Sequence, residues 1–509
     1  MKLNKMLPLS SEKITGSTDI EISGISYDSR NIKKGDIFFA LPGHNTDGLK
    51  FAEEAVSKGA CAVVCEAEGS NLNVTQITVK DILKFMSEFC AKFYGHPDRE
   101  MTVIGITGTN GKTTITYIIE SILADSGIQC GVIGTVNYRY AGKVFDAPNT
   151  TPQSADVYRM MREMADCGIK YAVMEVSSHA LSLGRVAGID FDIAIFTNLT
   201  RDHLDFHKDI EKYFEAKSML FVDLGKGTKT NTKYAIINTN DKFGKKLSKI
   251  NINAENKSYG AKSGGSADFQ AENIEIKSSG SSFNIVHGTE SEKIEINHIG
   301  LHNVYNALAA LASCVCCGIS FRKASEGLSR SAQAPGRLER VDTKNSGFEI
   351  VVDYAHTDDA LVNVLSALKK IKPVRIITVF GCGGDRDRTK RPIMGKTAVE
   401  MSDFVFVTSD NPRTENANNI ILDVEVGIKR AGKKNYKVIA DREKAIKEAV
   451  MMAEKGDIVL LAGKGHETYQ IIGTEKIHFN DIEIAEKYLK EKEKQKFSSK
   501  RIEQKEFVF

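Results

Sequence analysis

The stretch GITGTNGKTT, residues 105–114, decides the fold of this chain. The apolar run 101–106 leads into it and predicts a buried strand, and a helix is expected over about 112–126. The stretch departs slightly from the G-x-x-x-x-G-K-[ST] motif, because Ile106 stands where the first glycine would be. Its glycines still let the backbone curl, so that successive N–H groups and the helix N-terminus can point at phosphate oxygens. The stretch therefore predicts a phosphate-binding loop between a strand and a helix.

Two side chains at the end of this loop indicate the chemistry that it supports. Lys112 can reach the β- and γ-phosphates of a nucleotide, and the hydroxyl of Thr113 can bind Mg²⁺. ATPases, GTPases, kinases and ligases all use such a loop, so the rest of the sequence has to distinguish between them.

Strand and helix patterns alternate on both sides of the loop and predict an α/β protein with parallel sheets flanked by helices. The Ser- and Gly-rich segment 260–295 differs, and its alternating pattern predicts antiparallel strands at the edge of the central sheet. We expect three domains and a tail: a small N-terminal α/β domain over 1–98, a central domain with the phosphate loop over 99–333, a Rossmann-like α/β domain over 334–490, and a charged tail over 491–509 that continues a fraying helix.

The composition is that of an ordinary globular protein. The 509 residues include 69 Lys and Arg against 66 Asp and Glu, and this balance argues against a nucleic-acid-binding protein. The nine cysteines form no facing pair of CxxC motifs, which argues against a structural zinc site and against a disulfide framework. The sequence shows neither a signal-peptide pattern nor an apolar run of membrane-spanning length, so we expect a cytoplasmic protein without a membrane partner, and a monomer.

Acidic and imidazole side chains follow two predicted strands of the central domain. Glu175 ends the strand 171–175, where a second metal ligand is expected in a parallel sheet. After the strand 193–197 come Asp202, His203, Asp205 and His207, and this crowding favours a metal or phosphate role for His203. The amphipathic pattern of 213–221 predicts, by contrast, that Lys217 is an ordinary surface lysine.

Motifs that begin with the phosphate loop occur in a fixed order: GTNGKTT, EVSSH, TNLTRDHLD, YFEAKSMLF, HNVYNALAA, APGRLERV and VDYAHT. In this combination the chain resembles the Mur ligase family, the ATP-dependent ligases that build the peptide of peptidoglycan, over about residues 25–488. The segments 28–30 (DSR), 381–387 (GCGGDRD) and 410–413 (DNPR) are most similar to the members that add the third residue of that peptide. DNPR is associated in this family with meso-diaminopimelate, and lysine-adding members differ there.

The resemblance implies ATP and Mg²⁺ as cofactors, and it implies a role for each matching residue. Catalysis would involve Lys112, Glu175, His203 and Lys217. Metal ligands would be Thr113, Glu175, His203 and a carbamylated Lys217, whose modification replaces a cation by a carboxylate-like anion. ATP would be bound by Gly108, Thr109, Asn110, Gly111, Lys112, Thr113, Thr114, Asn303, Asn306, Arg337, Asp353 and His356. The UDP-muramoyl dipeptide would be bound by Ser29, His44, Asn45, Thr46, Asn149, Thr150, Thr151, Ser177 and Arg185. Diaminopimelate would be bound by Arg386, Asp410, Asn411, Pro412, Arg413, Gly463 and Glu467.

The proposed diaminopimelate residues suit an amino acid with two amines and two carboxylates. Arg386 and Arg413 can each bind a carboxylate bidentately, while Asp410 and Glu467 can take the distal ammonium. Lysine lacks the distal carboxylate and would leave a buried arginine unpaired. Two positions depart from the family pattern: Leu183 stands where relatives often have a polar residue, and Thr357 is followed by Asp358 instead of the frequent proline.

The resemblance therefore implies an ATP-dependent ligase that adds meso-2,6-diaminopimelate to UDP-N-acetylmuramoyl-L-alanyl-D-glutamate through an acyl phosphate. A lysine-adding member and a folylpolyglutamate-type synthetase of the same fold are the alternatives, and a non-catalytic nucleotide-binding regulator is a third. The residues 410–413 and 29–30 count against the first two. Five intact residues count against the third: Lys112, Thr113, Glu175, His203 and Lys217.

Overall fold

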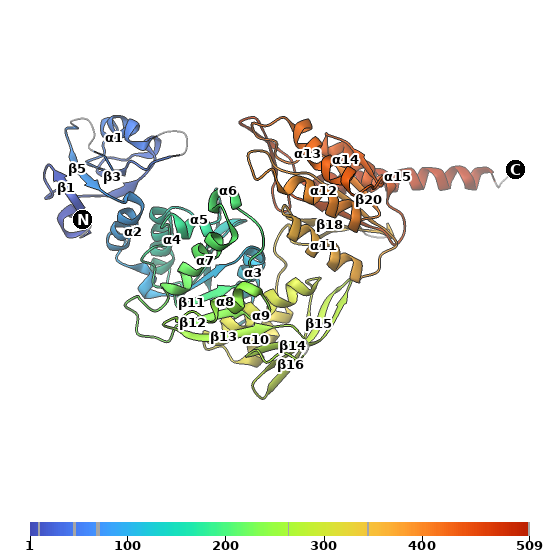
Figure 1. The fold of residues 1–509 in the computed structure, drawn as a ribbon, viewed down its shortest axis with the longest axis horizontal. Coiled ribbons are helices and arrows are strands. Elements are labelled where there is room, and N and C mark those ends of the chain that lie inside the picture. Colours follow the sequence, from blue (N-terminus) through green and yellow to red (C-terminus); the bar gives the residue numbers. More distant parts are fainter. Residues whose placement is uncertain (9–10, 44–46, 68–71, 263, 344–345, 507–509) are drawn as a thin grey trace.

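The computed structural model describes residues 1–509 except 9–10, 44–46, 68–71, 263, 344–345 and 507–509. Within this described part, the strands form three large sheets of five, eleven and six strands and one two-stranded hairpin. Each large sheet belongs to one continuous stretch of chain, which we call the N-terminal, central and C-terminal units. In Figure 1 the N-terminal and C-terminal units lie on opposite sides of the central unit, and both lie above it in that view.

The N-terminal unit is a small sheet in the order β1-β5-β4-β3-β2, parallel except for β1. The ring of Phe39 packs against Phe85 and Phe89 of the helix that follows the sheet, and this helix leads into the central unit. The elements are β1 Ser11–Thr15, β2 Gly24–Ser26, β3 Asp36–Phe39, α1 Ala52–Ser57, β4 Ala62–Cys65, β5 Thr75–Val79 and α2 Ile82–Phe93.

The central unit is built on a sheet in the order β16-β15-β14-β13-β12-β11-β6-β10-β7-β8-β9. The strand β6 lies in the parallel part, and its side chains alternate between two cores: Ile104 and Ile106 pack with α3 and α9, whereas Val103 packs toward α4 and α7. The elements are β6 Thr102–Thr107, α3 Lys112–Asp125, β7 Cys130–Ile133, β8 Asn137–Tyr140, β9 Lys143–Asp146, α4 Ser154–Asp166, β10 Tyr171–Glu175, α5 Ser178–Ser182, β11 Ile193–Phe196, α6 Leu204–His207, α7 Ile210–Val222, β12 Tyr234–Asn238, α8 Lys242–Leu247, β13 Glu255–Gly260, β14 Phe269–Lys277, β15 Gly280–His287, β16 Glu290–Ile296, α9 Leu301–Cys316 and α10 Phe321–Ser329.

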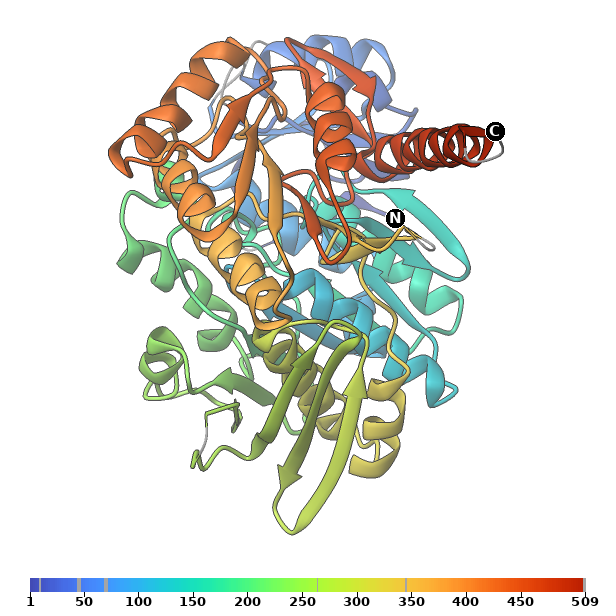
Figure 2. The ribbon, with the colours of Figure 1, turned by 90° about the vertical axis from the view of Figure 1, so that its right-hand side faces the viewer.

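The antiparallel strands expected at one edge of this sheet are β14, β15 and β16. They form the long hairpins at the bottom of Figure 2.

The C-terminal unit has a sheet in the order β17-β18-β22-β19-β20-β21, parallel except for β17. Its last helix, α15, begins with Asp481 bound to the buried Arg442 and then extends away from the body of the protein (Figure 1). The elements are β17 Glu339–Val341, β18 Glu349–Asp353, α11 Asp358–Lys370, β19 Ile376–Phe380, α12 Lys390–Met401, β20 Phe404–Val407, α13 Ala417–Arg430, β21 Tyr436–Val438, α14 Arg442–Met452, β22 Ile458–Ala462, β23 Tyr469–Ile472, β24 Glu475–His478 and α15 Asp481–Glu506.

Two further expectations concern the cysteines and the membrane. All nine cysteines lie in the described part of the chain and are free, which confirms that disulfides do not hold the fold together. None of the described helices is both long and apolar enough to cross a bilayer.

Candidate active site

The loop between β6 and α3 is held close to its neighbours by two glycines. Gly108 and Gly111 have φ angles of 145° and 94°, in the region that favours glycine. A Cβ at Gly108 would lie 1.8 Å from Thr197 Oγ1, and a Cβ at Gly111 would lie 2.3 Å from Asn306 Oδ1. The strand–loop–helix expected from the sequence is therefore present, and both positions require glycine because Thr197 and Asn306 occupy the space that a side chain would need.

Two lysines meet at this loop. Lys112 Nζ donates to the carbonyl oxygens of Gly108 and Thr109, each at 2.9 Å, and Lys217 Nζ donates to the same Gly108 oxygen at 2.9 Å. Lys217 is only 1% exposed, so the expectation of a surface lysine was wrong. Burial and, secondarily, the neighbouring Lys112 hold the pKa of Lys217 well below its ordinary value. The buried site therefore favours the uncharged amine form of Lys217 more than water does.

A hydroxyl and a carboxylate lie together at the start of α3. Thr113 Oγ1 donates to Glu175 Oε2 at 3.1 Å, and Thr135 donates to Glu175 through its backbone N–H (2.8 Å) and its hydroxyl (2.9 Å). Among the described residues, no group of three or more His, Cys, Asp and Glu side chains could hold a metal ion. Mg²⁺ commonly binds through one or two protein oxygens and completes its shell with water and phosphate oxygens. The oxygen donors of Thr113 and Glu175 fit such an ion.

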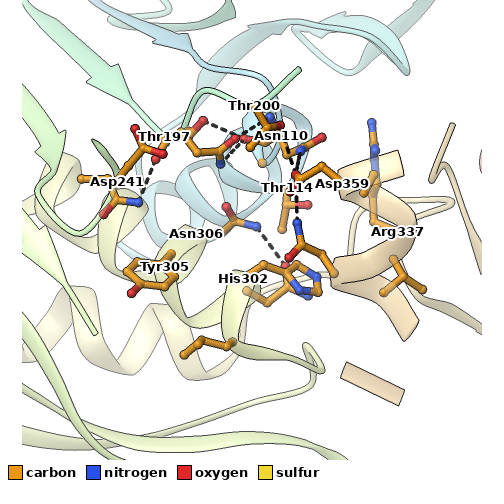
Figure 3. A pocket seen from close by; sticks show the side chains of 18 of the residues that line it. Asn110, Thr114, Thr197, Thr200, Asp241, His302, Tyr305, Asn306, Arg337 and Asp359 are labelled. Carbon is orange, nitrogen blue, oxygen red and sulfur yellow. Dashed lines mark hydrogen bonds between the residues drawn. The ribbon is translucent and has the colours of Figure 1, made fainter. Parts of the chain in front are cut away.

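A cavity of about 340 Å³, which we call the Asn-rich cavity, opens beside the loop (Figure 3). Tyr305 of α9 faces Asp241 across it, and Asn306 Nδ2 donates to Asn303 Oδ1 at 3.0 Å. Amide side chains offer both donors and acceptors, as the edge of a nucleobase does. The lining residues include Asn110, Gly111, Thr114, Asn198, Asn238, Asn240, Asn303, Asn306, Arg337, Asp353, Asp359 and Asn363.

Asp359 of α11 attaches the C-terminal unit to this cavity. Its Oδ2 accepts hydrogen bonds from Asn110 Nδ2 (2.9 Å), Thr200 Oγ1 (3.1 Å) and Asn363 Nδ2 (3.1 Å), and the first two cross between units. We expect Asp359→Ala to weaken nucleotide binding about 30-fold, because two hydrogen bonds of about 1 kcal/mol each are lost. Calorimetric titration with a non-hydrolysable ATP analogue measures this, with Asp358→Ala as the matched control. An unchanged Kd would show that this contact does not support the nucleotide site.

A second cavity, of about 510 Å³, lies between the central and C-terminal units, and we call it the interdomain cavity. One side carries residues that the sequence assigns to the muramoyl peptide, and the other carries residues assigned to diaminopimelate. From the central unit come Asn149, Thr150, Thr151, Ser177, Arg185 and His203. From the C-terminal unit come His356, Arg386, Asp410, Asn411, Arg413, Gly463 and Glu467.

Hydrogen bonds fix the side chains of the C-terminal wall. Asn411 Nδ2 donates to Glu467 Oε2 at 2.8 Å, and Arg413 Nη1 donates to the Gly384 carbonyl at 2.7 Å. Asp410 Oδ1 accepts from the Asn411 N–H at 2.7 Å, whereas its Oδ2 is buried without a hydrogen-bond partner in the described part of the structure. A buried carboxylate oxygen without a donor is costly unless a ligand supplies one. Burial, and then the neighbouring Asp410, raises the pKa of Glu467.

Imidazoles gather on the central wall. His203 packs edge-to-face on His179, with ring centroids 4.8 Å apart, and its Nε2 lies 3.3 Å from Asp202 Oδ2. Burial lowers the pKa of His203 to about 3 and that of His356 to about 4. Both rings are therefore neutral at physiological pH, the form in which imidazole binds metals.

The structure separates some of the predicted site residues from the two cavities. Ser29 donates to Glu54 in the N-terminal unit, and His44–Thr46 lie outside the described residues. The other predicted residues that line neither cavity are Gly108, Thr109, Lys112, Thr113, Glu175, Lys217 and Pro412. The sequence analysis missed other residues at the site: Asp359, His179, Lys390, Tyr354 and His466 line the cavities, and the buried Lys464 contacts Asn411 and Glu467. Four of them had a sequence signal: His179 and Tyr354 lie in the motifs EVSSH and VDYAHT, and Lys464 and His466 lie between Gly463 and Glu467.

Family models match all three units of the chain. They are described as Mur ligase family, catalytic domain (residues 21–94), Mur ligase middle domain (106–314) and Mur ligase, glutamate ligase domain (336–465). This chain belongs to the Mur ligase family. A relative from Clostridium acetobutylicum is 44% identical over 494 residues, covering 96% of this chain and 100% of the relative. A second, from Geobacter metallireducens, is 45% identical and covers 92% of this chain and 94% of its own length. Both relatives are named UDP-N-acetylmuramoyl-L-alanyl-D-glutamate–2,6-diaminopimelate ligase, and the name of the first ends in the numeral 1.

Solved structures agree with this family. A structure of a UDP-N-acetylmuramoyl-L-alanyl-D-glutamate–2,6-diaminopimelate ligase is 33% identical, with a TM-score of 0.68, and covers 97% of this chain and 99% of its own. A MurF ligase from Thermotoga maritima in complex with ADP has a TM-score of 0.64 at 17% identity and covers 93% of this chain and 98% of its own, a likeness of fold.

Proposed function

We propose that this chain uses ATP to join meso-2,6-diaminopimelate to the D-glutamate of UDP-N-acetylmuramoyl-L-alanyl-D-glutamate, in the synthesis of peptidoglycan precursors. The observation that carries the proposal is the interdomain cavity. Arg185 and Thr151 of the central unit line this cavity together with Asp410 and Arg413 of the C-terminal unit, which supports the proposal. The two substrates can therefore meet in one cavity, one from each side.

The γ-carboxylate of D-glutamate is a poor electrophile and has to be activated before an amine can attack it. ATP converts it to an acyl phosphate, the amine of diaminopimelate then attacks the acyl carbon, and phosphate leaves. Lys112 and the N–H groups of the phosphate loop would hold the anionic phosphates. Thr113 and Glu175 would hold Mg²⁺, which would supply neutralisation of phosphate charge and alignment of the phosphoryl group.

Three charged side chains of the C-terminal wall have a matching group on diaminopimelate. Arg413 and Arg386 can bind the two carboxylates. Asp410 Oδ2 has no hydrogen-bond donor in the described part of the structure, and the distal ammonium can supply one. Lysine has the ammonium but not the distal carboxylate, so an arginine would stay unpaired in its complex. This reasoning favours diaminopimelate over lysine as the substrate.

An assay of phosphate release from ATP tests the function. The purified enzyme is given UDP-N-acetylmuramoyl-L-alanyl-D-glutamate with diaminopimelate, lysine or ornithine. We expect turnover that requires the UDP-dipeptide and that is at least about tenfold more efficient with diaminopimelate, because one charge-assisted contact is worth about that much. Preferential turnover of lysine would contradict the proposed specificity.

A further inference from the structure

Lys464 is a buried cation beside the interdomain cavity that the proposed mechanism does not use. Its side chain is 0% exposed and does not line the cavity. Nζ donates to Asn411 Oδ1 at 3.2 Å and to Glu467 Oε2 at 3.0 Å, and Asn411 Nδ2 donates to the same Glu467 oxygen. Lys464 therefore joins two side chains that face the cavity and lies behind both of them.

The contacts around Lys464 leave one of two neighbouring carboxylates in the cavity wall without a partner. Asp410 and Glu467 both line the cavity, and both are carboxylates. Lys464 offsets one of them through its ion pair with Glu467. Asp410 Oδ2 remains buried without a partner in the described part of the chain. A single ammonium entering the cavity can supply the donor that Asp410 Oδ2 lacks, whereas two unpaired carboxylates would repel each other.

We propose that Lys464 is a positioning residue for amino-acid specificity: it fixes Asn411 and Glu467 and cancels one of the two negative charges, so that the wall accepts one ammonium. The proposal rests on the proposed function, because it takes that ammonium to be the distal one of diaminopimelate. Lys464 acts through Asn411 and Glu467 and does not touch the substrate.

Removing Lys464 should change how binding depends on pH. Asp410 raises the pKa of Glu467 and Lys464 lowers it, with Arg442, Tyr354 and Tyr469 also close enough to interact with Glu467. Without Lys464, Glu467 keeps the effects of burial and of Asp410, and its pKa rises further. The ionised carboxylate is then lost at a higher pH as the solution is acidified. The acidic limb of kcat/KM for diaminopimelate should move to higher pH.

The experiment compares the full-length wild type with Lys464→Met, Glu467→Gln and the double variant. We expect Lys464→Met to raise KM for diaminopimelate by about 10- to 100-fold and to leave KM for ATP and for the UDP-dipeptide unchanged. Because Lys464 acts in part through Glu467, the double variant should lose less than the sum of the two single losses. Lys464→Gln keeps a hydrogen-bond donor but removes the charge, so it should still shift the acidic limb to higher pH. This variant replaces Lys464→Met in the test if Lys464→Met does not fold.

The outcomes separate this proposal from the proposed function. A wild type that does not turn over diaminopimelate would contradict the function itself. Turnover by the wild type, together with an unchanged KM in Lys464→Met, would overturn the role of Lys464. The role would also be overturned if KM rose equally for all three substrates, if the two substitutions had additive effects, or if the acidic limb of kcat/KM did not shift. Lys464 would then be a structural residue only.

Discussion

Lys217→Ala is expected to lower kcat by about 10²- to 10³-fold, the range seen when one group that stabilises a transition state is removed. Lys217 is buried, its Nζ lies 2.9 Å from the Gly108 carbonyl oxygen, and its pKa lies well below the ordinary value. A neutral amine is the form that adds CO₂, and the resulting carbamate would be an anion beside Lys112. The carbamate and the ammonium of Lys112 would then attract each other at the phosphate loop.

Three measurements test this expectation. Steady-state kcat is compared between wild type, Lys217→Ala and the control Lys212→Ala, which removes an exposed lysine from the same helix. Nuclear magnetic resonance with ¹³C-bicarbonate should give a carbamate signal in the wild type that is absent from Lys217→Ala. Bicarbonate-depleted buffer should lower the wild-type rate. A fully active enzyme whose intact mass shows an unmodified lysine would contradict carbamylation.

The parts of the site that the sequence predicted are those whose signal is local. The phosphate loop was predictable because an apolar strand, two glycines and a helix follow one another within residues 101–126, and all of these elements are present. Asp410–Arg413 was likewise predictable as a turn after a strand, since β20 ends at Val407. In both cases neighbouring residues determine the backbone, so short-range patterns suffice.

The buried lysines could not be predicted in this way. The sequence pattern of α7 gives no sign that Lys217 is buried. The reason is that other elements cover most of the circumference of this helix, whose buried residues include Tyr213, Phe214, Ala216, Leu220 and Phe221. Lys464 stands between two glycines, which in sequence predicts an exposed turn. Its partner Asn411 is far away in the sequence, and Asp359 likewise binds Asn110 of another unit. Contacts of this kind depend on how the units pack, which periodicity does not report.

Arg413→Ala is expected to raise KM for diaminopimelate by about 10- to 100-fold, because a charge-assisted bond to a carboxylate contributes about 1.5–3 kcal/mol. The backbone holds Arg413 in place: its N–H donates to Ile471 O at 3.1 Å, and its carbonyl accepts from Gly473 N–H at 2.8 Å. Its φ of 51° lies in the left-handed region, and Nη1 is fixed on Gly384 O. The guanidinium therefore lies ready at the cavity before the substrate arrives.

Selectivity gives the sharper test of Arg413. Lysine has no distal carboxylate, so the low kcat/KM for lysine should change little in Arg413→Ala. The ratio of kcat/KM for diaminopimelate to that for lysine should therefore fall strongly. Arg413→Lys should recover only part of it, because an ammonium keeps the charge but loses the bidentate geometry. The exposed Arg388 serves as the control for removing an arginine nearby, and the Kd of an ATP analogue should be unchanged in all three variants. Equal losses for diaminopimelate and lysine would instead mean that Arg413 supports the wall as a whole and does not read the distal carboxylate.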